Sequence, residues 1–243
     1  MSSSLDLVIH CYAEQIPAFA NMLTALLSSL HCHPPKCRTT VVVITSPRDV
    51  LTQKVCDDFA ERDIAIRQLH LEDELLFRRA IGRNLAAKQG AADVVWFCDA
   101  DYYFGQGCLD AVANLDFSKA TMLYPRKAMI HVSHDAGDRE IARIVPGELF
   151  TPDFSLFEEW RIRKAIGGLQ IVSGDTARRG YLDQTTWTKP VTATKFLNTH
   201  CDKHFRRACG LSMPADIPNV WRFRHSESAF EGKEKRLRKA GKG

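Results

Sequence analysis

Short apolar runs alternate with amphipathic segments along the first half of this chain. Runs rich in β-branched and aromatic residues predict strands, at residues 5–10, 39–45, 64–69, 93–98 and 120–124. Apolar residues at helical spacing predict helices between them, at residues 16–30, about 47–62, 76–89 and 107–115. We therefore expect an α/β fold in which helices flank a mainly parallel central sheet. Ligands of such sheets gather at the carboxyl ends of the strands.

The second half has a weaker pattern. Residues 126–164 show no clean period, and we expect a long functional loop or lid there. A strand within residues 167–173, a helix near 195–208 and a strand at 219–225 follow. Because no linker interrupts this order, we expect a single domain over residues 1–230.

Composition narrows the class of protein without naming it. Hydrophobic residues make up 45% of the chain and charged residues 26%, which excludes fibrous and wholly disordered proteins. No apolar run is long enough to span a membrane, and the first residues lack the basic flank of a signal peptide. We therefore expect a cytoplasmic protein whose 8 cysteines are reduced. The cysteines and histidines at 31–37 lack a second ligand pair at zinc-finger spacing, so structural zinc is not favoured.

The formal net charge of +4 is concentrated at the end of the chain. Residues 231–243 carry six bases and two acids, and the other residues are balanced. We expect this basic tail to be flexible. DNA, an anionic membrane surface and a merely solubilising role all remain open for it.

Two carboxylates follow the apolar strand at 93–98. Asp99 and Asp101 are separated by one small residue, and paired acids at a strand end suit Mg²⁺ or Mn²⁺, which can bridge phosphate groups. The alternative is an ordinary acidic turn. Upstream, Arg79 and Arg83 lie four residues apart and share a helix face, where they either meet a diphosphate or form a solvated basic face.

These residues resemble the core signature of family 2 glycosyltransferases with the GT-A fold. The resemblance spans most of residues 5–230 and is strongest at 79–104. The matching segments are residues 81–87, 94–101, 8–12, 167–170 and 201–207. It implies a metal-dependent transfer of a sugar from a nucleotide-sugar donor to an acceptor hydroxyl, usually with inversion. It also implies a nucleotide-sugar half at about residues 1–125 and an acceptor half at about 126–230.

The resemblance assigns expected roles on the donor side. Arg83 and Arg79 are expected near the nucleotide diphosphate, and Tyr12 and Glu14 near the base. Gly168, in the glycine turn, is expected to contact the donor.

The resemblance also implies a cation site and a general base. Asp99 is expected to contact the ribose or the cation, and Asp101 with His225 to bind Mn²⁺ or Mg²⁺. Asp202 is the expected general base, with Asp183 as the second choice.

The sequence departs from the family pattern in two places. Thr45 and Ser46 stand where the family commonly has an acid for the base or ribose. Cys201 replaces the first acid of the family's Glu-Asp pair, and His204 stands where another acid is common.

Three further interpretations involve other residues or other classes of function. His131, His134 and Asp135 are read as a polar loop rather than ligands, and Trp187 as a partly buried side chain. The acceptor is a saccharide or, alternatively, modified bases of DNA. Nucleotidyl transfer and non-catalytic binding of a nucleotide sugar are the other classes that fit paired acids on an α/β sheet.

Overall fold

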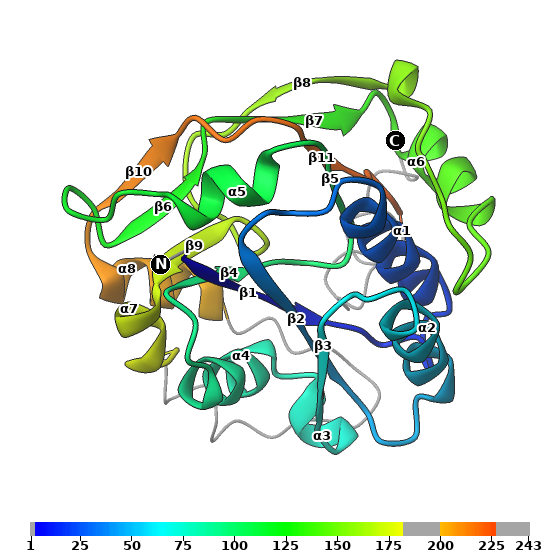
Figure 1. The fold of residues 1–243 in the computed structure, drawn as a ribbon, viewed down its shortest axis with the longest axis horizontal. Helices are drawn as coiled ribbons and strands as arrows, with labels where there is room; N and C mark the ends of the chain where they lie inside the picture. The colour runs from blue at the N-terminus through cyan, green and yellow to red at the C-terminus, as the bar shows by residue number, and fades with distance from the viewer. Residues whose placement is uncertain (1–2, 182–199, 227–243) are drawn as a thin grey trace, which may run out of the picture.

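The computed structural model describes residues 3–181 and 200–226. A seven-stranded sheet forms its centre (Figure 1). In order from one edge, the strands are β10 (Ser212–Ala215), β6 (Met122–Pro125), β9 (Gln170–Ser173), β4 (Val94–Phe97), β1 (Ser4–His10), β2 (Arg38–Thr45) and β3 (Ile66–His70). Only β9 is antiparallel to its neighbours, so the expected α/β fold with a mainly parallel sheet is confirmed.

Helices cover both faces of this sheet. The helices of the described residues are α1 (Ala18–Cys32), α2 (Val50–Ala60), α3 (Asp73–Leu76), α4 (Arg79–Gln89), α5 (Cys108–Ala113), α6 (His134–Ala142), α7 (Gly174–Arg178) and α8 (Cys201–Cys209). Figure 1 shows α4 and α5 on opposite sides of β1. Strand β1 is buried along its whole length, and its apolar run at residues 7–9 is accompanied by the buried polar residues Ser4, Asp6 and His10.

A second sheet of four strands was not expected. It consists of β5 (Tyr102–Phe104), β11 (Val220–Arg222), β7 (Lys127–His131) and β8 (Phe157–Arg161), in that order. The expectation of an irregular loop over residues 126–164 is therefore wrong. This stretch contains β7, α6, a 3₁₀ turn at Phe154–Leu156 and β8. Its strands are short and of mixed polarity, and they are stabilised by pairing with each other and with β11, which a local pattern does not reveal.

The helix expected at 76–89 also differs. Helix α3 ends at Leu76 and α4 begins at Arg79, and between them Arg78 has backbone angles that are not helical. The split makes Arg79 the first residue of α4 and places it at the carboxyl edge of the sheet.

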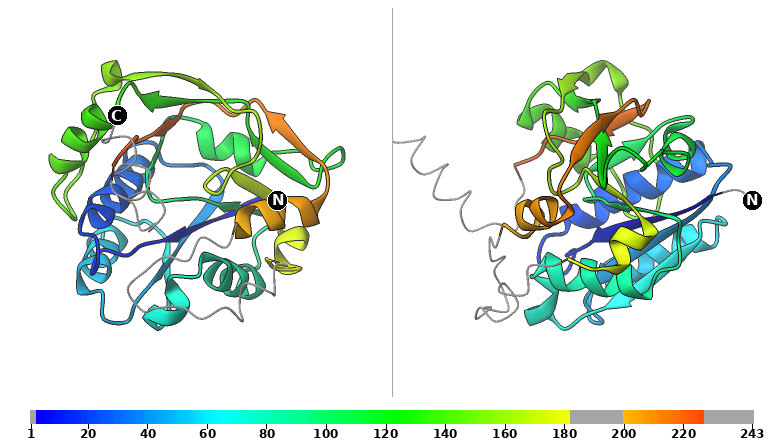
Figure 2. Two further views of the ribbon diagram at one scale, coloured as in Figure 1. Left: turned by 180° about the vertical axis from the view of Figure 1, so that it is seen from behind. Right: turned by 90° about the vertical axis from the view of Figure 1, so that its left-hand side faces the viewer.

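The carboxyl end of β1 lies on the same side of the molecule as α8. The right-hand view of Figure 2 shows β1 running from the N-terminus toward the end of the molecule where α8 lies. The cysteines, all within the described residues, form no disulfide. None of the helices in the described ranges has the length and apolarity that a membrane span requires. Asp183, Trp187 and the basic tail at 231–243 lie outside the described residues.

Candidate active site

The connection between β4 and β5 carries both candidate acids. Residues 98–101 leave the large sheet at Phe97 and enter the second sheet at Tyr102, so Asp99 and Asp101 lie where the two sheets meet. This position gives the two carboxylates different surroundings, since Asp99 faces arginines of helix α4 and Asp101 faces Arg222 of the second sheet.

Asp99 is held by two arginines of α4. Its Oδ1 accepts hydrogen bonds from Arg79 Nη1 and Arg83 Nη2, both at 3.0 Å. Arg83 is completely buried and also donates to Tyr181 Oη at 2.8 Å and to the carbonyl of Cys98 at 3.3 Å. Burial lowers the pKa of Arg83, but Tyr181 and Asp99 outweigh it and raise the pKa. Arg83 is thus enclosed and positions Asp99, whereas Arg79 keeps part of its side chain exposed.

Asp101 faces the other sheet. Its Oδ2 accepts from Arg222 Nε at 2.9 Å and lies 3.5 Å from His225 Nε2. The contact follows from the sheet register, because Arg222 on β11 pairs with Tyr102 on β5. Burial raises the pKa of Asp101, but Arg222 and His225 outweigh burial and lower the pKa to about 2. Asp101 is therefore an anion at neutral pH despite being buried.

Helix α6 holds the segment that carries His225. His131 Nδ1 accepts from the Arg224 amide at 3.4 Å, and Asp138 accepts from both the amide and the hydroxyl of Ser226. His131, expected in a polar loop, is instead a completely buried residue of β7. His134 and Asp135 lie in the first turn of α6.

A glycine turn before β9 brings the candidate base to the same place. A Cβ on Gly168 would lie 2.8 Å from Asp99 Oδ2, and a Cβ on Gly167 would lie 3.6 Å from Asp202 Oδ2 and 3.7 Å from Arg79 Nη1. Asp202, at the start of α8, is therefore close to Arg79. Gly167 lies beside Asp202, and Gly168 lies beside Asp99. The structure thus brings together seven of the expected site residues: Arg79, Arg83, Asp99, Asp101, Gly168, Asp202 and His225.

Gly168→Ala is expected to destabilise the protein by about 2 kcal/mol, because its Cβ would overpack Asp99 and also lie 2.9 Å from Tyr102 Cε2. Gly167→Ala is the matched control, since its Cβ makes only ordinary contacts. Urea unfolding of both variants measures the difference. Equal stability of the two would contradict the close packing of Asp99 against Gly168.

The two residues expected near the base lie at the end of β1. Tyr12 is buried, with its ring stacked on Phe77 at 5.6 Å and edge-on to Phe19. Glu14 is exposed and accepts from Gln15 at 3.2 Å. Their contact with a nucleobase stays a prediction.

Several residues at the site were not found from the sequence. Tyr181, Gln170 and Arg222 each contact a site residue through a side chain. Arg222 lies in a correctly expected strand, but only the pairing of β11 with β5 reveals its partner. Arg78, next to Arg79, has a guanidinium that makes no hydrogen bond to any described residue.

The residues around Asp101 fit a divalent cation whose coordination shell is completed by a bound substrate. Asp101 Oδ1 is buried and makes no hydrogen bond within residues 3–181 and 200–226, so one hard oxygen remains available beside His225. The described residues contain no group of three or more His, Cys, Asp or Glu side chains arranged to hold a metal. Mg²⁺ and Mn²⁺ commonly use one or two protein ligands together with substrate phosphates, and this donor set suits that mode.

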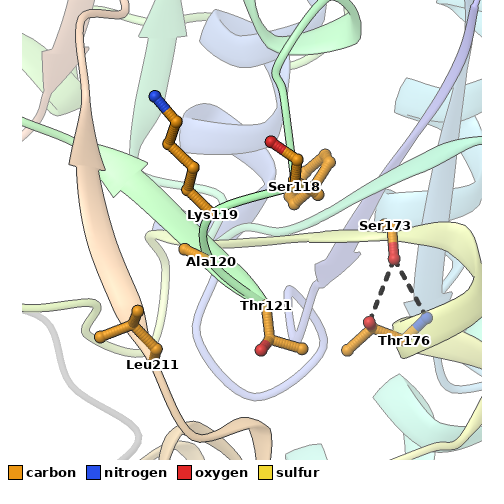
Figure 3. A pocket seen from close by; sticks show the side chains of 8 residues that line it. Ser118, Lys119, Ala120, Thr121, Ser173, Thr176 and Leu211 are labelled. Carbon is orange, nitrogen blue, oxygen red and sulfur yellow. Dashed lines mark hydrogen bonds between the residues drawn. The ribbon is translucent and has the colours of Figure 1, made fainter.

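A surface hollow of about 230 Å³ lies elsewhere (Figure 3). It is lined by Phe117, Ser118, Lys119, Ala120, Thr121, Ser173, Thr176 and Leu211. None of these residues belongs to the candidate site, and the Ser173 and Thr176 hydroxyls already bond each other at 3.0 Å.

Comparison with known proteins relates this architecture to solved structures. No protein-family model matches the sequence, and no curated protein matches it. The structure of S. aureus TarS aligns with a TM-score of 0.54 and 15% identity, covering 90% of this chain and 36% of that chain. The structure of TarS 1–349 in complex with UDP aligns with a TM-score of 0.51 and 16% identity, covering 90% of this chain and 60% of that chain.

The fold is of the GT-A type. At such low identity the similarity is one of fold alone, and this chain spans between about a third and three fifths of the TarS chains it matches.

Proposed function

We propose that this protein is a glycosyltransferase that moves a sugar from a nucleotide-sugar donor to an acceptor hydroxyl. The observation that carries the proposal is the meeting of Asp99, Asp101, Arg79 and Asp202 at the carboxyl edge of a GT-A sheet. The similarity of the fold to TarS 1–349 in complex with UDP supports a nucleoside diphosphate as the leaving group.

The donor is proposed to bind along the ends of β1 and β4. Asp99, oriented by Arg83 and packed closely against the backbone of Gly168, faces the ribose. Arg79 and the neighbouring Arg78 neutralise the diphosphate. The guanidinium nitrogens of Arg78 make no hydrogen bond to any described residue and can donate to phosphate oxygens. Tyr12 and Glu14 lie toward the base.

Asp101 and His225 would hold the divalent cation. When bound, Mn²⁺ or Mg²⁺ supplies positive charge that stabilises the departing diphosphate. Arg222 keeps Asp101 ionised and in place, and Arg79 adds a fixed cation next to Asp99. Together these groups favour charge on the leaving group over charge on the intact donor.

Asp202 is proposed as the general base. Its carboxylate is partly exposed at the start of α8, near Arg79, where an acceptor hydroxyl can reach it. The proton of the acceptor hydroxyl passes to Asp202 as the acceptor oxygen attacks the anomeric carbon. Attack from the face opposite the diphosphate inverts the configuration at that carbon.

Binding of a nucleoside diphosphate tests the proposal directly. Thermal shifts with UDP, GDP and ADP, with and without Mn²⁺, are expected to show one preferred nucleotide. At 100 times its Kd that nucleotide adds about 2.7 kcal/mol to stability. Arg79→Met is expected to reduce the shift, and Arg161→Met, an exposed arginine on β8, serves as the control.

Product analysis then separates the classes of reaction. With sugar donors of the preferred nucleotide and a panel of oligosaccharides and DNA, the nucleoside diphosphate is expected as product. Pyrophosphate would indicate nucleotidyl transfer instead. Nucleotide binding without any product over long incubation would reduce the protein to a binding module.

A further inference from the structure

Three buried polar side chains connect Asp99 with Asp202, the candidate base. Arg83 lies on α4, Gln170 is the first residue of β9, and Tyr181 follows α7. All three are completely buried, although they come from elements far apart in the sequence. A buried polar network of this kind is stable only when each member has its partners.

The hydrogen bonds form one continuous chain. Arg83 Nη2 donates to Asp99, and Arg83 Nη1 donates to Tyr181 Oη at 2.8 Å. The Tyr181 hydroxyl donates to Gln170 Oε1 at 2.5 Å, and Gln170 Nε2 donates to the backbone carbonyl of Asp202 at 2.8 Å.

The chemistry of the partners determines the direction of the chain. A guanidinium only donates and a backbone carbonyl only accepts, so the two ends are unambiguous. Burial raises the pKa of Tyr181, so its hydroxyl keeps the proton that it gives to Gln170. The Gln170 amide must therefore accept on one side and donate on the other. A carboxylate at this position could accept from Tyr181 but could not donate to Asp202.

The hydrogen bond from Gln170 holds α8 at Asp202, the candidate base. The ring of Tyr181 stacks on Phe205 at 4.1 Å, and Phe97 meets Phe205 edge-on. Arg206 Nη1 donates to the carbonyl of Ala165 at 2.5 Å, whereas the Gln170 bond is made at Asp202 itself. Gln170 itself cannot move freely, because it pairs with Phe97 in the sheet, two residues before Asp99. The side-chain amide of Gln170 thus ties the first turn of α8 to β9, and the pairing of β9 with β4 links it to the strand that precedes Asp99.

We propose that Gln170 is a positioning residue that sets the Asp202 carboxylate relative to Asp99. It thereby couples the acceptor side of the site to the donor side. The role of Asp202 as base rests on the function proposed above, whereas the coupling of α8 to β9 does not.

The experiment compares Gln170→Met and Gln170→Glu with Gln53→Met. Gln53 is a matched control, because its amide also donates to a backbone carbonyl, that of Pro47 at 2.8 Å, on an exposed helix. Hydrogen exchange of the amides at 201–209 is the first readout, and steady-state kinetics with the preferred donor are the second. Tyr181→Phe keeps the stacked ring and tests the same chain if the Gln170 variants fail to fold.

Both Gln170 variants are expected to exchange at least about tenfold faster within 201–209 than wild type, with no change in Gln53→Met. Turnover is expected to fall at least about tenfold while the KM for the donor stays within about twofold, since a small displacement of the base leaves donor contacts intact. In an Asp202→Asn background, Gln170→Met is expected to cost less than about a further twofold, because the two act as one unit.

Other results overturn the proposal. Unchanged exchange at 201–209, a rise in donor KM alone, or full multiplication of the losses in the double variant would each show that Gln170 does not act through Asp202. If the wild type neither binds a nucleotide nor turns over any donor, the proposed function fails. The exchange readout alone then decides whether Gln170 holds α8.

Discussion

Asp101→Asn is expected to lower turnover by about 1000-fold and the free energy of unfolding by about 3 kcal/mol. The loss of turnover follows from removal of a cation ligand and of a fixed negative charge. The loss of stability has a different cause. Arg222 is largely enclosed next to Asp101, and asparagine would leave its guanidinium without a counter-charge.

The double variant Asp101→Asn/Arg222→Met separates the two effects. Removing both charges is expected to restore most of the stability, because an unpaired buried cation is no longer present. Turnover and Mn²⁺ binding, measured by kinetics and calorimetry, are expected to stay lost. EDTA is expected to inactivate the wild type to the same extent. Full activity of the double variant, or of the wild type in EDTA, would refute the cation site.

The same ion pair predicts how stability depends on pH. The pKa of Asp101 is lowered from 3.8 to about 2 in the folded protein, so the pair stabilises the fold fully above the unfolded value. That stabilisation is lost as the pH falls from about 4 toward 2. Melting temperatures across this range are expected to fall more steeply for the wild type than for the double variant.

Asp202→Asn is expected to reduce transfer at least about 100-fold, the usual contribution of a general base. Nucleotide binding is expected to stay within about twofold of wild type, since Asp202 is proposed to contact the acceptor hydroxyl rather than the nucleotide. Stability is also expected to be unchanged, because Gln170 bonds the backbone of Asp202 rather than its carboxylate.

Transfer rates of Asp202→Asn and of the neighbouring control Lys203→Met, an exposed residue of α8, measure this prediction. A rate for Asp202→Asn equal to that of the control would move the base elsewhere. Asp183, the second choice, would then be the next residue to replace.

Six strands of the large sheet were predictable, and its central strands are buried on both faces, whereas the edge strand β10 was not expected from the sequence. Buried strands of this kind contain short uninterrupted apolar runs. The bounds of β1, β2 and β4 were each predicted to within a residue or two. The second sheet was not predictable in the same way. Strand β8 is an edge strand with two adjacent glutamates, and its stability comes from pairing with β7.

The candidate site divides along the same line. Asp99, Asp101 and Arg79 were candidates because the motif and the helix face are local in sequence, and Gly168 was a candidate through the family resemblance. Arg83 was also found, but only the structure shows that it is enclosed and holds Asp99 rather than facing outward. Burial of this kind depends on Tyr181 and Phe97, which approach Arg83 from other elements.

The sequence by itself determined the α/β class, the order of the strands in the first half and the two acids at the end of β4. These features depend on short-range patterns of apolar residues and on a motif of three residues. The tertiary structure alone decided which partners the acids have: Arg83 for Asp99 and Arg222 for Asp101. The physical reason is that charge pairing across 16 or 121 residues depends on how strands and helices pack, which no local pattern encodes.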